Sequence, residues 1–211
     1  MKVLFAGGTG LVGAHAVRRL VERGHAVTAV GRRGTGVATD ELIVDFAALP
    51  ALPAADAAVC ALGTTRATAG SRDAMRAVDV DAVIAFADAA HTAGARHCVL
   101  VTAVGADARS GVAYSRMKGE AEDAVAALGF EGVDILQPGL LIGARDERRP
   151  VEAFFQAVSP VLDRLLLPAF DRYGSIPAET VGAAIVALVE RGGAGVHRHE
   201  NRSIRLLAER G

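Results

Sequence analysis

The chain has 211 residues, a length typical of one domain with a substantial hydrophobic core, and its formal net charge is −1. This charge balance gives no electrostatic reason to expect nucleic acid or an anionic membrane, so a small molecule is the expected partner. The N-terminal stretch MKVLFAGGTG breaks into glycines too early for a signal peptide. No apolar run is long enough to predict a transmembrane helix.

The cysteines and the basic residues suggest a compartment and a source. Cys60 and Cys98 each fall in a short apolar run typical of a buried strand, so we expect packing residues rather than a disulfide. Free, buried thiols favour a cytoplasmic protein. Only Lys2 and Lys118 are lysines among the 23 basic residues, and this excess of arginine fits a bacterial gene of high GC content.

Short apolar runs alternate with helical periodicity along most of the chain. The runs predict six buried strands, at residues 2–6, 26–30, 41–45, 57–62, 97–102 and 133–139. Helical spacing predicts helices at residues 11–22, about 71–93, 113–128, about 151–166 and 178–190. This alternation predicts a doubly wound parallel α/β sheet with helices on both faces. We expect one domain over residues 1–211, in which residues from about 140 to 211 contribute a small C-terminal cap on the substrate side.

A glycine-rich stretch, AGGTGLVG, separates the first predicted strand from the first predicted helix. It matches G-x-G-x-x-G at Gly8, Gly10 and Gly13, and such a pattern by itself also arises by chance or as a plain turn. Its position favours a dinucleotide site, because glycines let the backbone approach a pyrophosphate while the helix N-terminus offers free N–H groups. The residues expected to contact the cofactor are Gly7, Gly8, Thr9, Gly10, Leu11, Val12 and Gly13.

The end of the second predicted strand bears on the choice between NADP(H) and NAD(H). An acidic residue usually stands there when the cofactor has no 2′-phosphate, but this chain has Gly31 followed by Arg32 and Arg33. A guanidinium can hold a 2′-phosphate, so NADP(H) is favoured over NAD(H), although a solvated basic turn would have the same sequence. Asp45, which ends the third predicted strand, could bind the adenine amino group or be an ordinary strand-end acid.

A rare tyrosine and a rare lysine stand four residues apart in the stretch AYSRMKGE. The chain has only two tyrosines and two lysines, so the pairing of Tyr114 with Lys118 is improbable by accident. On a helix these positions share one face, which places the ammonium beside the phenol. Lowering the pKa of a tyrosine from about 10 to about 7 needs roughly 4 kcal/mol. The ammonium and a bound cationic nicotinamide could supply this stabilisation.

These motifs resemble the short-chain dehydrogenase/reductase superfamily, and more narrowly its small atypical branch that includes the Tat-interacting-protein-like oxidoreductases. The stretches ALGTTRATAGS, VTAVGADARSGVAYSRMKGEAE and LQPGLLIGARDERR extend the likeness over most of the chain. The resemblance implies a Rossmann fold, with Tyr114 as general acid/base and Lys118 on the nicotinamide ribose. It also implies that further residues border the cofactor, namely Leu62, Gly63, Thr64, Pro138 and Gly139.

Two positions depart from the pattern of that superfamily. Its members normally carry a serine at the end of the fifth strand to orient the substrate carbonyl, where this chain has Thr102 and then Ala103. Thr102 is therefore the third candidate catalytic residue, with a plain strand residue as the alternative and Ser110 as a weaker substitute. An asparagine of the usual proton relay is replaced by Asp79, so a relay through this position is in question.

Two classes of function fit these features. The favoured one is an NADP(H)-dependent oxidoreductase that transfers a hydride between nicotinamide and a small carbonyl or alcohol substrate, acting as a monomer or homodimer. The alternative is an NADP(H)-binding regulatory or sensor protein with little or no turnover. His197 and His199 lack a third metal ligand, so no metal site is expected. An anionic substrate could meet a basic stretch at Arg145, Arg148 and Arg149, which could equally be a solvated loop.

Overall fold

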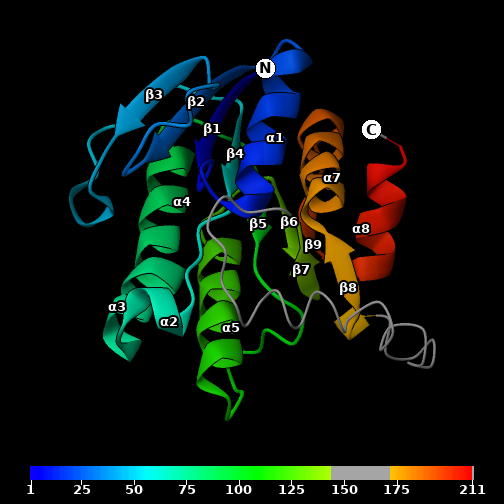
Figure 1. Cartoon of the computed structure of the whole chain (residues 1–211). Helices are drawn as coiled ribbons and strands as arrows, with labels where there is room; N and C mark the ends of the chain where they lie inside the picture. Colours follow the sequence, from blue (N-terminus) through cyan, green and yellow to red (C-terminus); the bar gives the residue numbers. More distant parts are fainter. Residues whose placement is uncertain (144–171, 211) are drawn as a thin grey trace.

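A parallel sheet runs through the part of the chain that the computed structural model describes, residues 1–143 and 172–210. Within this part the sheet has seven strands in the order β3-β2-β1-β4-β5-β6-β9, with every neighbouring pair parallel (Figure 1). The strands are β1 (Lys2–Ala6), β2 (Ala26–Gly31), β3 (Asp40–Ile43), β4 (Ala57–Cys60), β5 (His97–Val101), β6 (Gly132–Gln137) and β9 (Gly195–Glu200). A separate parallel pair consists of β7 (Leu140–Ile142) and β8 (Ser175–Pro177).

Helices cover both faces of the sheet (Figure 1). One face carries α1 (Leu11–Glu22) and α7 (Ala178–Arg191), and α8 (Asn201–Ala208) packs beside α7. The other face carries α4 (Ala82–Thr92) and α5 (Ala113–Ala126). Because both faces are covered, every residue of β4, β5 and β6 is buried, which explains why their sequences are mostly apolar and do not alternate. The polar exceptions are His97, Asp134 and Gln137.

The segment between β4 and β5 is a broken helix rather than a continuous one. It contains α2 (Arg66–Ala69), α3 (Arg72–Arg76), a π-helical turn (Ala77–Asp81) and then α4. Ser71 caps α3 by accepting a hydrogen bond from the N–H of Ala74. π-Helical turns are rare and frequently occur at functional sites, because the extra residue re-aims a side chain. Here the turn carries the buried Asp79.

The predicted doubly wound α/β architecture is confirmed, and all six predicted strands are present. A short 3₁₀ turn (Phe46–Ala48) follows β3. The seventh strand, β9, was not among the predicted strands. The described C-terminal residues add β9 and two helices to the central layers, while the predicted helix at about 151–166 lies outside the described residues. Within the described residues, no helix is long and apolar enough to cross a membrane.

Candidate functional site

The candidate site lies where the order of the strands reverses. After β1 the chain builds β2 and β3 on one side and then returns to place β4 on the other. In open parallel sheets, ligands bind at the carboxyl ends of the strands on either side of such a switch point. The loops after β1 and β4 touch here, because a Cβ atom added at Gly7 would lie only 2.4 Å from the carbonyl oxygen of Ala61.

The glycine-rich loop has the shape that a pyrophosphate needs. Gly7 has a φ of +86°, which favours glycine, and a Cβ added at Gly13 would lie 2.1 Å from the carbonyl oxygen of Gly7. Helix α1 begins after Gly10, which has no side chain to cap the first N–H groups, and its first turn holds no acidic residue. The helix N-terminus is therefore open to an anion, and these residues fit the phosphates of a dinucleotide.

The arginine pair directly follows β2, as the sequence predicted. Arg32 and Arg33 are exposed, and no acidic side chain of the described residues forms an ion pair with either. The loop after them is ordered by Glu41, whose carboxylate accepts hydrogen bonds from the N–H groups of Thr35 and Gly36 at 2.9 and 3.0 Å. The proposed contact of Arg32 and Arg33 with a 2′-phosphate stays a prediction.

Asp45 has a structural partner within its own loop. Its side chain accepts a hydrogen bond of 3.0 Å from the N–H of Ala47 and caps the short 3₁₀ turn that follows β3. The aspartate is exposed. This capping role matches the reading of Asp45 as an ordinary strand-end acid, and its contact with adenine stays a prediction.

A buried ion pair joins three segments at the centre of the site. The Lys118 ammonium of α5 lies 2.5 Å from Asp79 Oδ1 on the π-helical turn, with exposures of only 4% and 1%. The contact is an ion pair rather than a well-aligned hydrogen bond. The other carboxylate oxygen, Oδ2, accepts a hydrogen bond of 3.2 Å from the N–H of Thr64. A Cβ added at Gly63 would lie 3.5 Å from both charged groups, so the loop after β4 adjoins the pair.

Tyr114 stands one helical turn before Lys118, with the Lys118 ammonium 6.0 Å from the centre of its ring. The predicted pairing on one helix face is therefore present. Tyr114 keeps 42% of its surface exposed. Burial nevertheless raises the pKa of the phenol, the Lys118 charge lowers it, and the Asp79 charge raises it again, with a net shift upward from 10.0. The Lys118 charge acts in the expected direction, and the further lowering of this pKa by a bound nicotinamide stays a prediction.

The hydroxyl of Thr102 contacts a buried carboxylate, and its role with a substrate stays a prediction. Its Oγ1 donates a hydrogen bond of 2.7 Å to Glu122 Oε1, and Glu122 is only 1% exposed. Gln137 and Arg198 also donate to this carboxylate, at 2.8 and 2.9 Å. The sequence offered one hint of this cluster, since Glu122 lies four residues after Lys118 on α5 and eight after Tyr114. Ser110 accepts a hydrogen bond from the N–H of Val112 within its own loop.

The end of β6 lies beside the end of β5. The carbonyl oxygen of Pro138 accepts a hydrogen bond of 2.9 Å from the N–H of Val104, and Gly139 donates its N–H to Asn201 Oδ1 at 2.9 Å. Pro138 directly follows β6, and Thr102 directly follows the neighbouring strand β5, so both lie at the carboxyl edge of the sheet, as the glycine-rich loop does. This placement agrees with a position beside the cofactor, which stays a prediction.

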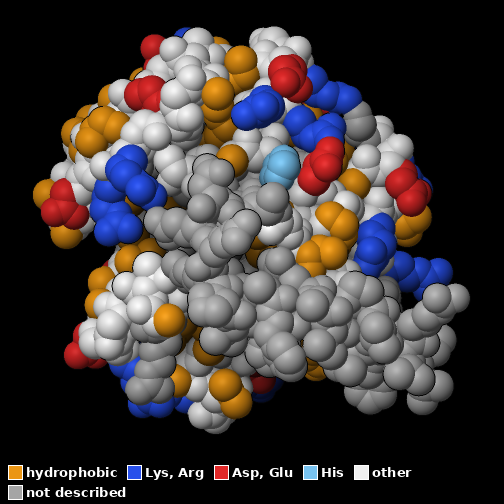
Figure 2. Space-filling model, in the orientation of Figure 1, with side chains coloured by type: hydrophobic (Ala, Val, Ile, Leu, Met, Phe, Trp, Pro, Cys, Tyr) orange, Lys and Arg blue, Asp and Glu red, His pale blue; other side chains and the backbone are white. Residues whose placement is uncertain are grey.

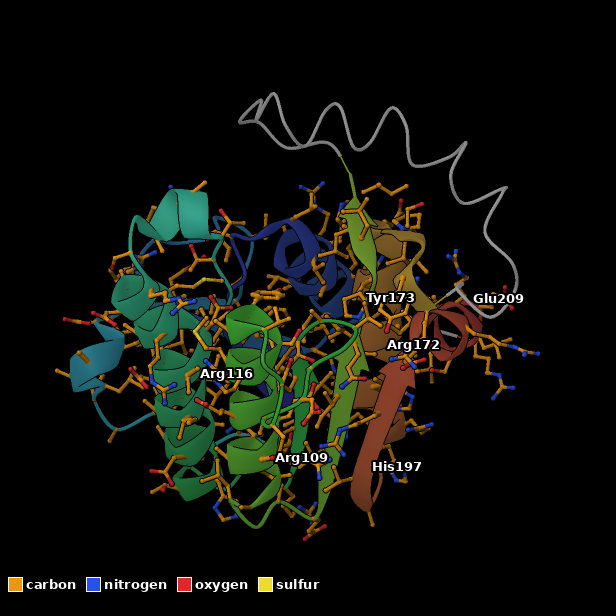
Figure 3. The ribbon with its side chains drawn as sticks, turned by 90° about the horizontal axis from the view of Figure 1, so that it is seen from below. Arg109, Arg116, Arg172, Tyr173, His197 and Glu209 are labelled. Atoms are coloured by element: carbon orange, nitrogen blue, oxygen red, sulfur yellow. The ribbon has the colours of Figure 1, made fainter. Side chains whose placement is uncertain are left out.

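The two C-terminal histidines belong to the edge of the sheet rather than to this site. Figure 3 shows His197 on β9, which pairs with β6 and not with the strands of the switch point. His199 Nε2 lies 2.6 Å from Asp134 Oδ1, and His97 Nε2 lies 2.8 Å from Asp134 Oδ2. Among the described residues, no group of His, Cys, Asp and Glu could hold a metal ion. Arg145, Arg148 and Arg149 lie outside the described residues.

A glycine-rich loop at the switch point of a doubly wound sheet, next to a Tyr–Lys pair on one helix face, defines a dinucleotide-binding protein of the short-chain dehydrogenase/reductase type. The sequence model of the NAD dependent epimerase/dehydratase family matches residues 3–98. The protein named "Protein fmp52, mitochondrial" from Emericella nidulans is 37% identical over 202 residues, covering 87% of this chain and 85% of that protein. Its namesake from Aspergillus clavatus is 39% identical over 166 residues, covering 72% and 71%.

Solved structures show the same fold at low sequence identity. A short-chain dehydrogenase/reductase superfamily protein from Agrobacterium tumefaciens with bound NAD has a TM-score of 0.73 and 18% identity, covering 100% of this chain and 81% of that chain. Human epimerase family protein SDR39U1 with NADPH has a TM-score of 0.65 and 19% identity, covering 95% and 74%. The chain belongs to the same family as the fungal fmp52 proteins, and its residues 3–98 are similar to the NAD dependent epimerase/dehydratase family. The Tat-interacting-protein-like branch stays a prediction.

These relatives correct the expectation of a bacterial, cytoplasmic protein. The fmp52 proteins come from fungi and are named mitochondrial. The expectation rested on the free cysteines and on the excess of arginine. Both cysteines are buried and unpaired, as predicted, but a buried thiol is protected from oxidation by its surroundings and therefore does not identify a compartment.

Proposed function

We propose that the protein is an NADP(H)-dependent oxidoreductase that transfers a hydride between nicotinamide and a small carbonyl or alcohol substrate. The observation that carries this proposal is the contiguity of the site. Gly7 contacts the loop after β4, Gly63 of that loop adjoins Lys118, and Lys118 lies one helical turn from Tyr114. A parallel-sheet switch point, a phosphate-binding loop and a phenol beside an ammonium are the parts that such chemistry requires.

Each part of the chain has a distinct task in this proposal. When bound, the nicotinamide supplies or accepts the hydride. The N–H groups at the start of α1 hold the pyrophosphate, and Arg32, helped by Arg33, holds the 2′-phosphate. Lys118 holds ribose hydroxyls, because its flexible side chain can donate hydrogen bonds in several directions. Tyr114 exchanges a proton with the oxygen of the substrate.

The net charge of −1 supports a small molecule as the partner, rather than nucleic acid. On the face shown in Figure 2, the described acidic and basic side chains are interspersed rather than gathered by sign. A monomer or a homodimer agrees with these features. Size-exclusion chromatography with light scattering at two protein concentrations would decide between the two.

Cofactor binding is the first test of the proposal. Calorimetric titration with NADPH is expected to show micromolar binding, and NADH is expected to bind more weakly. An Arg32→Ala variant should lose about tenfold or more in affinity for NADPH and little for NADH, because one charge-assisted contact to phosphate is removed. Arg18, which is exposed on α1, provides the control variant Arg18→Ala. Failure of both nucleotides to bind would overturn the proposal.

Turnover is the second test. With a panel of aldehydes and ketones and NADPH, the parent protein is expected to consume the cofactor, and Tyr114→Phe is expected to lose this activity while its NADPH affinity is unchanged. Tyr173→Phe is the matched control, because Tyr173 is the other tyrosine of the chain and lies in the segment just before β8. Equal activity of Tyr114→Phe and the parent would rule out the phenol as the proton donor.

A second candidate function is an NADP(H)-binding sensor with little or no turnover. The observation that favours it concerns the hydroxyl that should orient the substrate. The Thr102 hydroxyl donates a hydrogen bond to Glu122, and the following residue, Ala103, has no hydroxyl at all. If NADPH binds tightly but no carbonyl compound of the panel is reduced, even in a single turnover at high protein concentration, the sensor is the better description.

A further inference from the structure

The Lys118 ammonium has an anionic partner that is held in place from two sides. Asp79 Oδ1 lies 2.5 Å from the ammonium nitrogen, and Asp79 Oδ2 accepts the N–H of Thr64. The π-helical turn places Asp79 in the interior, where it is 1% exposed. A charge pair that is so deeply buried is weakly screened, so the aspartate offsets most of the field of the lysine at nearby atoms.

The phenol of Tyr114 therefore meets a compensated pair rather than a free cation. The charged groups that act on it are Lys118, from its own helix, and Asp79, from the π-helical turn that packs against this helix. Their effects have opposite sign, since the lysine stabilises a tyrosinate and the aspartate destabilises it. The Cys60 thiol of β4 faces the same pair, but burial keeps it protonated.

We propose that Asp79 acts through Lys118 as a positioning and charge-compensating residue, which keeps Tyr114 protonated and sets the site to reduce carbonyl compounds rather than to oxidise alcohols. This inference rests on the proposed function and adds a reaction direction to it. A general base must be deprotonated before the reaction, whereas a general acid must arrive with its proton. Because the Lys118–Asp79 pair is charge-compensated, it favours the protonated form of Tyr114 and hence its role as a general acid.

The reductive step balances with the groups at hand. The carbonyl carbon of the substrate accepts the hydride that reduced nicotinamide supplies, and the carbonyl oxygen accepts the proton of the Tyr114 phenol. The O–H bond of the phenol breaks, and an alcohol, an oxidised cofactor and a tyrosinate result. The tyrosinate then regains a proton from water, which restores the site.

The composition of the chain allows a direct measurement of Tyr114. The protein has no tryptophan and only two tyrosines, so Tyr173→Phe leaves Tyr114 as the sole phenol. Its ionisation can be followed by the near-ultraviolet absorbance of tyrosinate, without a substrate or a cofactor. The measurement is made at each alkaline pH at which circular dichroism shows folded protein, and N-acetyl-tyrosinamide serves as the solvent-exposed reference.

In this background the parent is expected to show a smaller tyrosinate fraction than the reference at every pH. Asp79→Asn should raise the fraction above that of the parent, because it removes the negative charge and leaves the lysine uncompensated. The control is Asp81→Asn, which makes the same charge change two residues away on the exposed side of the π-helical turn and should match the parent.

Two results would overturn the inference. One is a tyrosinate fraction in the parent that exceeds the reference, because the lysine would then act as a free charge; this result needs no variant to fold. The other is a folded Asp79→Asn protein that titrates like the parent. Neither result depends on cofactor binding, so failure of NADPH to bind would overturn the proposed function separately and would leave the titration valid.

Discussion

At the scale of single residues, the hydroxyl of Thr102 has the clearest consequence. It donates a hydrogen bond of 2.7 Å to the buried carboxylate of Glu122, which also accepts hydrogen bonds from Gln137 and Arg198. We expect Thr102→Val, which keeps the shape of the side chain, to lower the free energy of unfolding by about 1–3 kcal/mol, because a buried charged group loses a hydrogen-bond donor. Urea denaturation at neutral pH measures this loss.

Thr102→Ser is the matched control, since it keeps the donor and should retain most of the stability. If Thr102→Val were as stable as the parent but inactive with carbonyl substrates, the hydroxyl would belong to substrate binding and not to the Glu122 cluster. The two variants together therefore separate a structural role of Thr102 from the catalytic role that its place in the sequence predicted.

At the scale of secondary-structure elements, the approach of α1 to the end of β1 depends on Gly13. A Cβ at this position would lie 2.1 Å from the Gly7 carbonyl oxygen and 3.0 Å from the Gly8 Cα, so backbone would have to move. We expect Gly13→Ala to lower the free energy of unfolding by about 1–3 kcal/mol and to weaken NADPH binding, because the same backbone shapes the phosphate site. Calorimetry and urea denaturation measure the two effects.

The control for this substitution is Gly111→Ala. Gly111 lies just before α5, and a Cβ added there would meet nothing within 4 Å. Its free energy of unfolding should stay within about 0.5 kcal/mol of the parent's. Unchanged nucleotide binding by a folded Gly13→Ala protein would show that the glycine-rich loop is a turn without a role in phosphate binding.

The attachment of β9 to the sheet depends on a buried aspartate as well as on backbone pairing. Burial acts to raise the pKa of Asp134, but hydrogen bonds from His199 and His97 outweigh it and lower the pKa well below its ordinary value. Arg191 also contacts this carboxylate, at 3.2 Å. A depressed pKa contributes stability above the unfolded-state value of about 4, and this contribution disappears as the pH falls through the folded-state pKa.

Asp134→Asn is therefore expected to lower the free energy of unfolding by about 1–3 kcal/mol at pH 7, and the difference from the parent should narrow below about pH 4. Urea denaturation at several pH values measures this difference. Asp123→Asn, an exposed change on α5, should show little pH-dependent difference from the parent. A deficit of Asp134→Asn that stays constant down to pH 3 would mean that the aspartate acts through shape rather than through charge.

At the scale of the whole molecule, the parts that could be predicted from sequence are those with local signals. The central strands are buried on both faces and so read as apolar runs, and Tyr114 and Lys118 share a face because their spacing matches a helical turn. The polar strand β9 lies at an edge with one neighbour, so its sequence GVHRHE shows no apolar run. Helical periodicity over residues 71–93 predicted one continuous helix, because a π-helical turn has no distinct pattern in the sequence.

Contacts between distant segments had no signal in one sequence. Glu122 and Arg198 are 76 residues apart, and their ion pair exists only because β9 pairs with β6. The same holds for Asp79 and Lys118, whose approach depends on the π-helical turn as well as on the packing of this turn against α5. Local patterns therefore predicted the positions of Tyr114 and Lys118, whereas the pairing of Lys118 with Asp79 and of Glu122 with Arg198 became visible only in the folded structure.

The two thiols turn the stability of the whole molecule into a test of cofactor binding. Cys60 and Cys98 lie on the adjacent central strands β4 and β5 and are fully buried; burial raises the pKa of Cys60 to about 11 and that of Cys98 further. Both should react with a thiol reagent only when the sheet opens, because a thiolate must form and be reached.

A ligand that binds only the folded protein divides the population of the open state by 1 + L/Kd, where L is the concentration of free ligand. We therefore expect NADPH at 100 times its dissociation constant to slow the labelling of both cysteines roughly 100-fold, and NADH at the same concentration to slow it less. Mass spectrometry of the two cysteine-containing peptides measures the rates, with urea-unfolded protein as the fully reactive control. Equal labelling rates with and without NADPH would have two explanations: the nucleotide does not bind, or the thiols react through a local opening of the sheet. The calorimetric titration decides between them.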